Sequence, residues 1–218
     1  MKTRSKAACA AMALTAVFLL GAVKPNELLI ESDTMTYNKN SSQAIFTGNV
    51  RVFSRDVEVK CEKLVSLNYQ DAAVATGKVR AYYRESGIRM TCRRLEYTKG
   101  MSLIKGEGRV TAIKEMEDGK KMIMKSDLLE FNSKEDTITA SGVNRKMRVE
   151  FDDVIAFADR AFYDQKTKDL DLEGRPVAVR NKSVFSSENI RLNTETKAMT
   201  LNKGNWAKVF YEDINAKD

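Results

Sequence analysis

The sequence predicts an all-β protein whose antiparallel strands follow one another in chain order and fold into an open, V-shaped roll. Two observations favour this class. Apolar and polar residues alternate along most of the chain, which is the pattern of half-buried strands. A glycine also returns at a nearly constant interval, and no stretch after residue 24 has the apolar period of a helix. We expect about a dozen consecutive strands.

The recurring glycines are expected to bend the strands at one level. They lie 29, 31, 34, 32 and 30 residues apart, at Gly48, Gly77, Gly108, Gly142, Gly174 and Gly204. A glycine inside a strand usually marks a bulge, a bend or a close backbone approach. Bends at the same depth in successive strands would lie side by side, so the sheet is predicted to be creased along its length with an apolar inside.

A six-residue motif precedes each of these glycines. It consists of a small residue, a usually acidic one, then an apolar and a usually aromatic residue at alternate positions, over 32–37, 61–66, 92–97, 126–131, 158–163 and 187–192. The small residue precedes the glycine by 16 positions in five units and by 17 in the last. Folding the first unit at its polar middle places Met35 opposite Phe46 and Asp33 opposite Gly48, so that apolar residues share one face.

The first 24 residues have a different composition. A basic start is followed by the uncharged, mostly apolar segment 7–23, in the order of a secretory signal peptide. Two alternatives stay open, a cleaved signal and an uncleaved membrane anchor. Without Lys2, Arg4, Lys6 and Lys24 the chain has 33 basic and 30 acidic residues, so its net charge falls to +3. This near balance argues against nucleic-acid binding. Residues 25–218 are predicted to form one domain of about six repeats.

The side chains needed for common catalytic sites are missing. The chain contains no His and no glycine-rich phosphate loop, so His-based nucleophile systems and metal sites are excluded. Acidic residues recur beside the glycines, but Arg93 interrupts the column formed by Asp33, Glu62, Asp127, Asp159 and Glu188. We expect these carboxylates to bond the backbone beside the bends. No catalytic residue, metal or cofactor is predicted, and a lyase or hydrolase remains the last alternative.

Cys61 and Cys92 occupy the same position in successive repeats, so their pairing tests the topology. In a coiled solenoid they would lie about 4.8 Å apart, within bridging range. In an antiparallel meander a strand lies between them, and the separation of about 9.6 Å is too large. Hairpin turn signals, FSRD at 53–56 and Glu-Asp-Gly at 117–119, favour the meander. We therefore predict unbridged thiols.

The repeat resembles a known family. The segment ESDTMTYNKNSSQAIFTGNVRVFSRDVEVKCEKL is similar to the OstA-like repeat of the lipopolysaccharide-transport proteins of the LptA and LptC types, with weaker echoes over residues 28–204. Unit six departs by the extra residue before Gly204, and the loop EMEDGKKM lengthens unit three. The resemblance implies a folded β-jelly roll whose inside receives the acyl chains of lipopolysaccharide. It also implies a periplasmic location and end-to-end stacking that bridges the inner and outer membranes.

Under this resemblance the apolar positions of the repeat become candidate groove residues. They are Met35, Tyr37, Phe46, Leu64, Leu95, Tyr97, Leu129, Phe131, Tyr163, Leu170, Leu172, Ile190 and Leu192. An open roll has two unpaired edges, expected at residues 28–37 and at the segment WAKVFY, 206–211. We expect these edges to pair with further copies, with an inner-membrane export complex and with an outer-membrane translocon.

Two alternatives to a free carrier are kept. An LptC-type component would retain residues 7–23 as its anchor in the inner membrane. A self-assembling structural β-roll would carry no lipid.

Overall fold

The computed structural model describes residues 28–67, 72–98 and 102–209, which form eighteen β-strands and no helix. The all-β prediction is therefore confirmed for this part of the chain. The expected signal or anchor segment, residues 1–24, lies outside the described residues, as do residues 210–211 of the expected C-terminal edge. Within the described ranges no helix is long and apolar enough to cross a membrane.

The strands have the following bounds, in chain order: β1 Leu29–Glu31, β2 Thr34–Asn38, β3 Gln43–Phe53, β4 Val57–Leu67, β5 Ala72–Tyr83, β6 Ile88–Thr98, β7 Leu103–Glu115, β8 Lys121–Asn132, β9 Thr137–Ser141, β10 Met147–Phe151, β11 Val154–Ala158, β12 Arg160–Asp164, β13 Asp169–Glu173, β14 Val177–Arg180, β15 Ser183–Ser186, β16 Asn189–Asn193, β17 Met199–Asn202 and β18 Trp206–Lys208.

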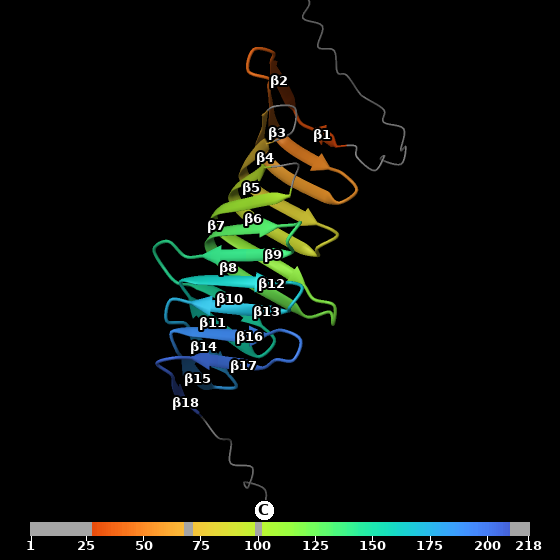
Figure 1. The fold of residues 1–218 in the computed structure, drawn as a ribbon. Helices are drawn as coiled ribbons and strands as arrows, with labels where there is room; N and C mark the ends of the chain where they lie inside the picture. Colours follow the sequence, from red (N-terminus) through yellow and green to blue (C-terminus); the bar gives the residue numbers. More distant parts are fainter. Residues whose placement is uncertain (1–27, 68–71, 99–101, 210–218) are drawn as a thin grey trace, which may run out of the picture.

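The eighteen strands are twelve bent strands in a simple meander. Strands β3 to β8 are continuous through their bend and are 11 to 13 residues long. The other six are interrupted at the bend and appear as the pairs β1/β2, β9/β10, β11/β12, β13/β14, β15/β16 and β17/β18. Each bent strand pairs antiparallel with its neighbours in the chain, as Figure 1 shows from orange to blue. The prediction of about a dozen consecutive strands is confirmed.

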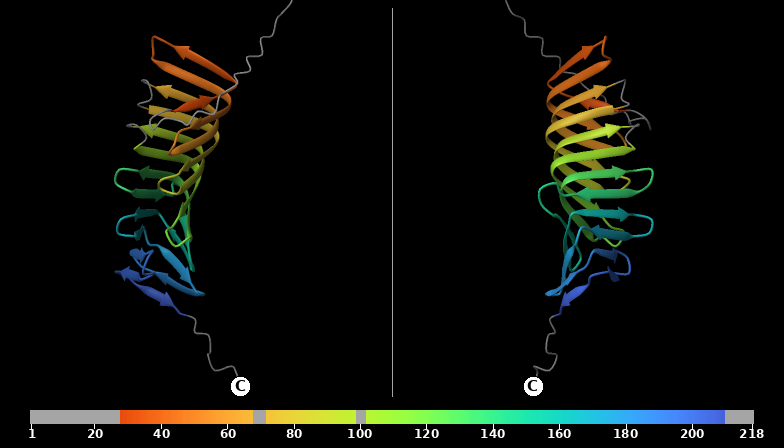
Figure 2. Two further views of the ribbon diagram at one scale, coloured as in Figure 1. Left: turned by 90° about the vertical axis from the view of Figure 1, so that its right-hand side faces the viewer. Right: turned by 60° about the vertical axis from the view of Figure 1, so that its left-hand side comes forward.

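The bend divides the sheet into two walls. The first wall consists of β2, β9, β12, β13, β16 and β17 with the adjoining halves of β3 to β8. The second wall consists of β1, β10, β11, β14, β15 and β18 with the other halves of the same long strands. The walls meet along the crease, and their hairpins form the mouth of the V on the other side. The two views of Figure 2 show the bent strands stacked along one axis.

The crease is built from glycine bulges. In β3, β5 and β7 the register shifts at the repeat glycine, for example between Thr47 and Val50. Gly48 has φ of +78° and the next residue, Asn49, has φ of +46°. Gly77, Gly108 and Gly174 repeat this pair of positive φ values with the residue that follows each. An extra residue in the left-handed region bends a strand and increases its twist, and glycine adopts that region without steric cost.

The side chain opposite the glycine explains why these positions also need the missing Cβ. A Cβ on Gly48 would lie 2.2 Å from Asp33 Oδ2, and one on Gly77 would lie 2.4 Å from Glu62 Oε2. The predicted pairing of Asp33 with Gly48 is confirmed by the hydrogen bond from Asp33 N to Gly48 O, 3.0 Å. Met35 also pairs with Phe46, as the folded repeat predicts.

Gly142 differs from the other repeat glycines. Its φ is not in the left-handed region, and a Cβ there would lie 1.8 Å from the carbonyl oxygen of Arg145. Here the strand does not continue through a bulge, because residues 142–146 form a loop between β9 and β10. At this position glycine is required by the close approach of the backbone rather than by its φ.

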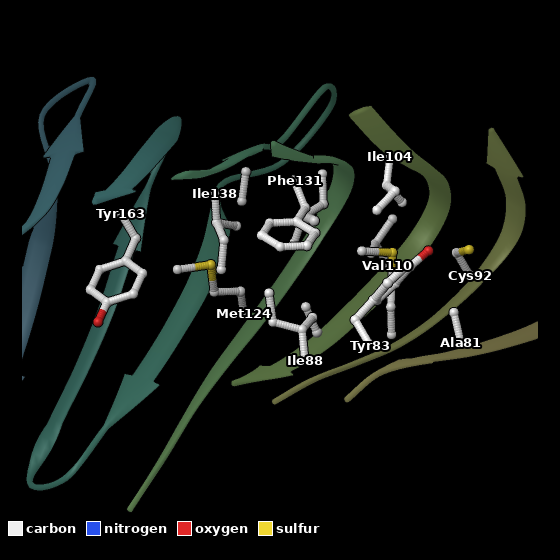
Figure 3. Packing of buried hydrophobic residues seen from close by; sticks show 14 of the residues in the cluster. Ala81, Tyr83, Ile88, Cys92, Ile104, Val110, Met124, Phe131, Ile138 and Tyr163 are labelled. Atoms are coloured by element: carbon white, nitrogen blue, oxygen red, sulfur yellow. The ribbon is translucent and has the colours of Figure 1, made fainter. Parts of the chain in front are cut away.

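The core is the space between the two walls, and both walls contribute to it. Inward positions alternate along each strand, and β6 buries Ile88, Met90, Cys92, Leu95 and Tyr97 in turn. Figure 3 shows side chains from the two walls meeting in this space. Ring contact joins the walls where Tyr83 of the second wall meets Phe131 of the first, with centroids 5.9 Å apart and an edge-to-face angle of 60°.

The cysteines lie where the meander places them. Cys61 is on β4 and Cys92 on β6, with β5 between them, and both are free and buried. Burial raises the pKa of each thiol to about 11, so both are protonated at neutral pH.

We expect Gly77→Ala to lower the free energy of unfolding by about 3 kcal/mol, because it combines left-handed strain with a collision against Glu62. The matched control is Gly119→Ala. Gly119 has φ of +79°, close to the +81° of Gly77, but nothing lies within 4 Å of its Cβ position, so about 1 kcal/mol of strain remains. Urea unfolding of both variants measures the difference, and equal losses would contradict the packing argument.

We expect the two thiols to resist iodoacetamide at pH 8 in the folded protein, since they are buried and their pKa is about 11. Both should react in denaturant without a reductant. Mass spectrometry counts the alkyl groups at Cys61 and Cys92. Failure to label them in denaturant until a reductant is added would reveal a disulfide and contradict the meander.

Candidate functional site

The thirteen candidate groove residues all lie on the first wall. Eleven of them are buried, at 8% exposure or less: Phe46, Leu64, Leu95, Tyr97, Leu129, Phe131, Tyr163, Leu170, Leu172, Ile190 and Leu192. Met35 and Tyr37 on β2 are 60% and 49% exposed, because β2 is the edge strand at the first end of its wall and pairs with β3 on one side only. The structure therefore brings eleven candidates together in one apolar surface and leaves two at its end.

Sequence reasoning missed the opposite wall of this interior. The second wall buries a matching set of apolar side chains, namely Val52, Val57, Val59, Ala81, Tyr83, Ile88, Met90, Ala112, Met122, Met124, Met147, Val149, Phe151, Val154 and Ala156. The candidates lie between the small residue and the glycine of each unit, and the strands in that segment belong to the first wall only. The alternation at Val57 and Val59, or at Ile88 and Met90, was the signal that could have identified the second wall.

The mouth of the V contains a cavity of about 910 Å³. It lies between the hairpins of the two walls, and apolar side chains reach it from both, including Tyr83 and Met116 from the second wall and Ile104, Phe131 and Tyr163 from the first. Three of these five are among the most deeply buried side chains of the protein. The cavity is thus continuous with the apolar interior and opens it to the outside between the hairpins.

Polar contacts join the two walls across the mouth in its C-terminal half. Lys168, in the hairpin between β12 and β13, forms an ion pair of 2.6 Å with Glu117, in the hairpin between β7 and β8. Lys197 forms an ion pair of 2.7 Å with Asp152, and its backbone oxygen accepts a hydrogen bond from Arg180. These contacts lie at the surface of the mouth, where ion pairs individually contribute little to stability.

The charged groups at the mouth have pKa values set by these contacts. The ammonium groups of Lys120 and Lys197 lower the pKa of Asp152 to about 2. Lys168 lowers the pKa of Glu117. Burial lowers the pKa of Lys114, whose ammonium group donates a hydrogen bond to the backbone oxygen of Ser86. At neutral pH the ion pairs across the mouth are therefore formed.

The two ends of the roll each present strands with an unpaired side. At the first end these are β1 and β2, which pair only with β3 among the described strands. At the last end they are β17 and β18, which pair only with β16 and β15 in the same part of the chain. Apolar side chains are exposed beside them, including Met35 at the first end and Trp206, 53% exposed, at the last.

The acidic column serves the crease rather than forming a catalytic pair. Asp127 Oδ2 accepts a hydrogen bond of 3.0 Å from Val143 N, and this bond lowers the pKa of Asp127. Asp33 Oδ2 accepts one of 3.0 Å from Asn49 Nδ2. A general acid needs a raised pKa, which is the opposite of the shift at Asp127. Among the described residues no cluster of Cys, Asp and Glu could hold a metal ion.

These features define an open β-roll of bent repeats with an apolar interior, a cavity at its mouth and edge strands at its two ends. The chain belongs to the family described as "LptA/(LptD N-terminal domain) LPS transport protein", whose model matches residues 29–198. The predicted resemblance to the LptA type is thereby confirmed. The family is one of lipopolysaccharide transport proteins and not of enzymes.

Two further comparisons were made. Among solved structures, the chain is similar to the crystal structure of LptH, "the LptA homologous periplasmic component of the conserved lipopolysaccharide transport device from Pseudomonas aeruginosa". The identity is 7%, the TM-score is 0.29, and the match covers 88% of this chain and 100% of that one. The search of curated proteins found no match.

We expect the ion pairs of Asp152 to add stability above pH 4 that is lost near pH 2. The folded pKa of about 2 lies below the ordinary value of 3.8, so folding favours the charged form and the benefit disappears as Asp152 takes up a proton. The Asp152→Asn variant should melt below the wild type at pH 6 and together with it near pH 2. Calorimetry measures both, with Glu85→Gln as an exposed control; a pH-independent difference would contradict the assignment.

Proposed function

We propose that this protein carries lipopolysaccharide by holding its acyl chains between the two walls. The observation that carries the proposal is the apolar interior itself, which follows the whole stack of bent strands and opens to a cavity at the mouth. Membership in a family of lipopolysaccharide transport proteins supports the choice of ligand. The thirteen candidate residues of the first wall and the opposing residues of the second wall would together form the lipid-binding groove.

The free energy of acyl-chain transfer is compatible with reversible binding along the apolar interior. Transfer of an acyl chain from water into an apolar wall is worth about 0.8 kcal/mol per buried methylene. A continuous apolar surface offers nearly equal free energy at each step along its length, so a chain can move without chemistry. Admission of the chains requires the walls to separate at the mouth, and there the contacts are exposed ion pairs such as Lys168 with Glu117.

The free edges suggest how copies would be arranged. An exposed strand edge can add a strand from another chain through main-chain hydrogen bonds. Pairing of β1 and β2 of one copy with β17 and β18 of the next would continue both walls and the interior between them. We propose such end-to-end assembly, with the terminal edges pairing to an inner-membrane export complex and to an outer-membrane translocon.

The corresponding location is the periplasm, reached by the segment of residues 1–24. Cleavage of that segment distinguishes the carrier from an anchored, LptC-type component. Residues 25–218 would then act as one domain of about six repeats.

The test is native mass spectrometry of the protein with purified lipopolysaccharide and with its deacylated sugar core. Saturable binding that needs the acyl chains is the expected result. Met116→Asp should weaken it by about tenfold, roughly 1.4 kcal/mol, because it places a charge on a cavity-lining side chain that packs against the apolar core. The matched control is Ile155→Asp on the outer face, where 37% of the residue is exposed.

Each outcome separates the functions. Equal binding of lipopolysaccharide and sugar core would contradict an acyl-chain groove. Oligomers that grow with concentration but bind no lipid would favour a structural β-roll. Circular dichroism and melting curves of both variants show whether a loss of binding comes from unfolding.

A further inference from the structure

The apolar interior contains two buried tyrosine hydroxyl groups that have only each other as neighbours for hydrogen bonding. Tyr83 and Tyr97 are 5% and 7% exposed, and their phenol groups interact with one another. The contact lacks normal hydrogen-bond geometry, and neither phenol oxygen has another partner among the described residues. A buried polar group normally finds a partner, since leaving it unpaired costs about 1–3 kcal/mol. The third buried tyrosine of the interior, Tyr163, follows this rule, because its hydroxyl lies 3.5 Å from Thr194 Oγ1.

The two phenols belong to opposite walls and point into the same region. Tyr83 ends β5 on the second wall and lines the cavity at the mouth, while Tyr97 is near the end of β6 on the first wall. Figure 3 shows the Tyr83 ring lying across the space between the walls, with its hydroxyl on the side of Cys92. Burial raises the pKa of Tyr83 well above its usual value, and the neighbouring Tyr97 and Cys92 raise it further.

The two thiols complete this polar region. Burial raises the pKa of Tyr97, and the neighbouring Cys61 and Cys92 contribute to the rise. We call the hydroxyls of Tyr83 and Tyr97 with the thiols of Cys61 and Cys92 the polar notch. All four groups stay protonated at neutral pH, so the notch presents O–H and S–H donors and no charge.

The chemistry of the notch selects a type of ligand. A charged group would lose its hydration in this apolar surrounding, whereas a neutral oxygen would satisfy the unpaired donors. We propose that the polar notch binds a hydroxyl or carbonyl oxygen carried on an acyl chain, so that the protein prefers oxygen-bearing acyl chains to plain hydrocarbon chains. This inference rests on the proposed function, because the chain must lie between the walls to reach the notch.

The experiment is a competition in native mass spectrometry between stearic acid and a hydroxystearic acid with its hydroxyl at mid-chain. The two probes share head group and chain length and differ by one oxygen atom. The full-length wild type should retain the hydroxylated acid about fivefold better, the effect expected of one hydrogen bond. The Tyr83→Phe/Tyr97→Phe double variant should bind the two acids about equally.

Tyr82→Phe is the matched control, since Tyr82 directly precedes Tyr83 on β5 and faces the other side of the sheet. Its ring packs against the Arg89 guanidinium on the outer face, with the guanidinium carbon 4.7 Å from the ring centroid. It should keep the wild-type preference. The double variant should melt no lower than the wild type, because it removes both members of the Tyr83–Tyr97 pair and these hydroxyls have no other partner among the described residues. A merely structural pair of tyrosines would instead give a lower melting temperature and an unchanged preference.

Three outcomes would contradict the proposal, and they differ in whether the notch or the whole groove is overturned. Binding of both acids without preference by the wild type would overturn the notch and leave the groove intact. A preference that survives in the double variant would place the oxygen elsewhere and also overturn the notch. Binding of neither acid, together with no acyl-dependent binding of lipopolysaccharide, would overturn the groove itself.

Discussion

The constraint on which the whole structure depends is that twelve strands bend at the same level. Two walls share one register only if each strand changes direction where its neighbours do, since a slip of one residue would turn inward side chains outward. The glycine bulges meet this requirement. At Gly48 and Gly77 the left-handed backbone bends the strand, and the side chains of Asp33 and Glu62 occupy the space that a Cβ would need.

The bend creates an inside, but a meander does not close it. In a barrel the first and last strands pair, whereas here β1/β2 and β17/β18 lie at opposite ends of the stack (Figure 1). The described strands therefore leave an edge at each end of the stack, and a cavity lies at the mouth. The walls are held together at the mouth by exposed ion pairs such as Lys168 with Glu117 and Lys197 with Asp152. The crease is thus fixed by the backbone, whereas the mouth is bridged by side chains.

The interior departs from a purely structural core in one respect. A roll selected for stability alone would replace a buried hydroxyl without a partner by an apolar group of the same shape. The phenols of Tyr83 and Tyr97 have only each other as neighbours for hydrogen bonding, and the hydroxyl of Ser126 has no partner among the described residues. Local inconsistencies of this kind are expected at functional sites, where a ligand completes what the fold leaves unpaired.

The sequence by itself determined the class of fold, the meander, the crease and the pairing of Met35 with Phe46, because strand alternation and glycine spacing are local properties of the chain. Only the tertiary structure decided how the two walls close on one another. The contact of Tyr83 with Phe131, the ion pair of Lys168 with Glu117 and the unpaired hydroxyls all depend on distances between walls. Such distances follow from the angle and twist of the crease, and no period in the sequence specifies them.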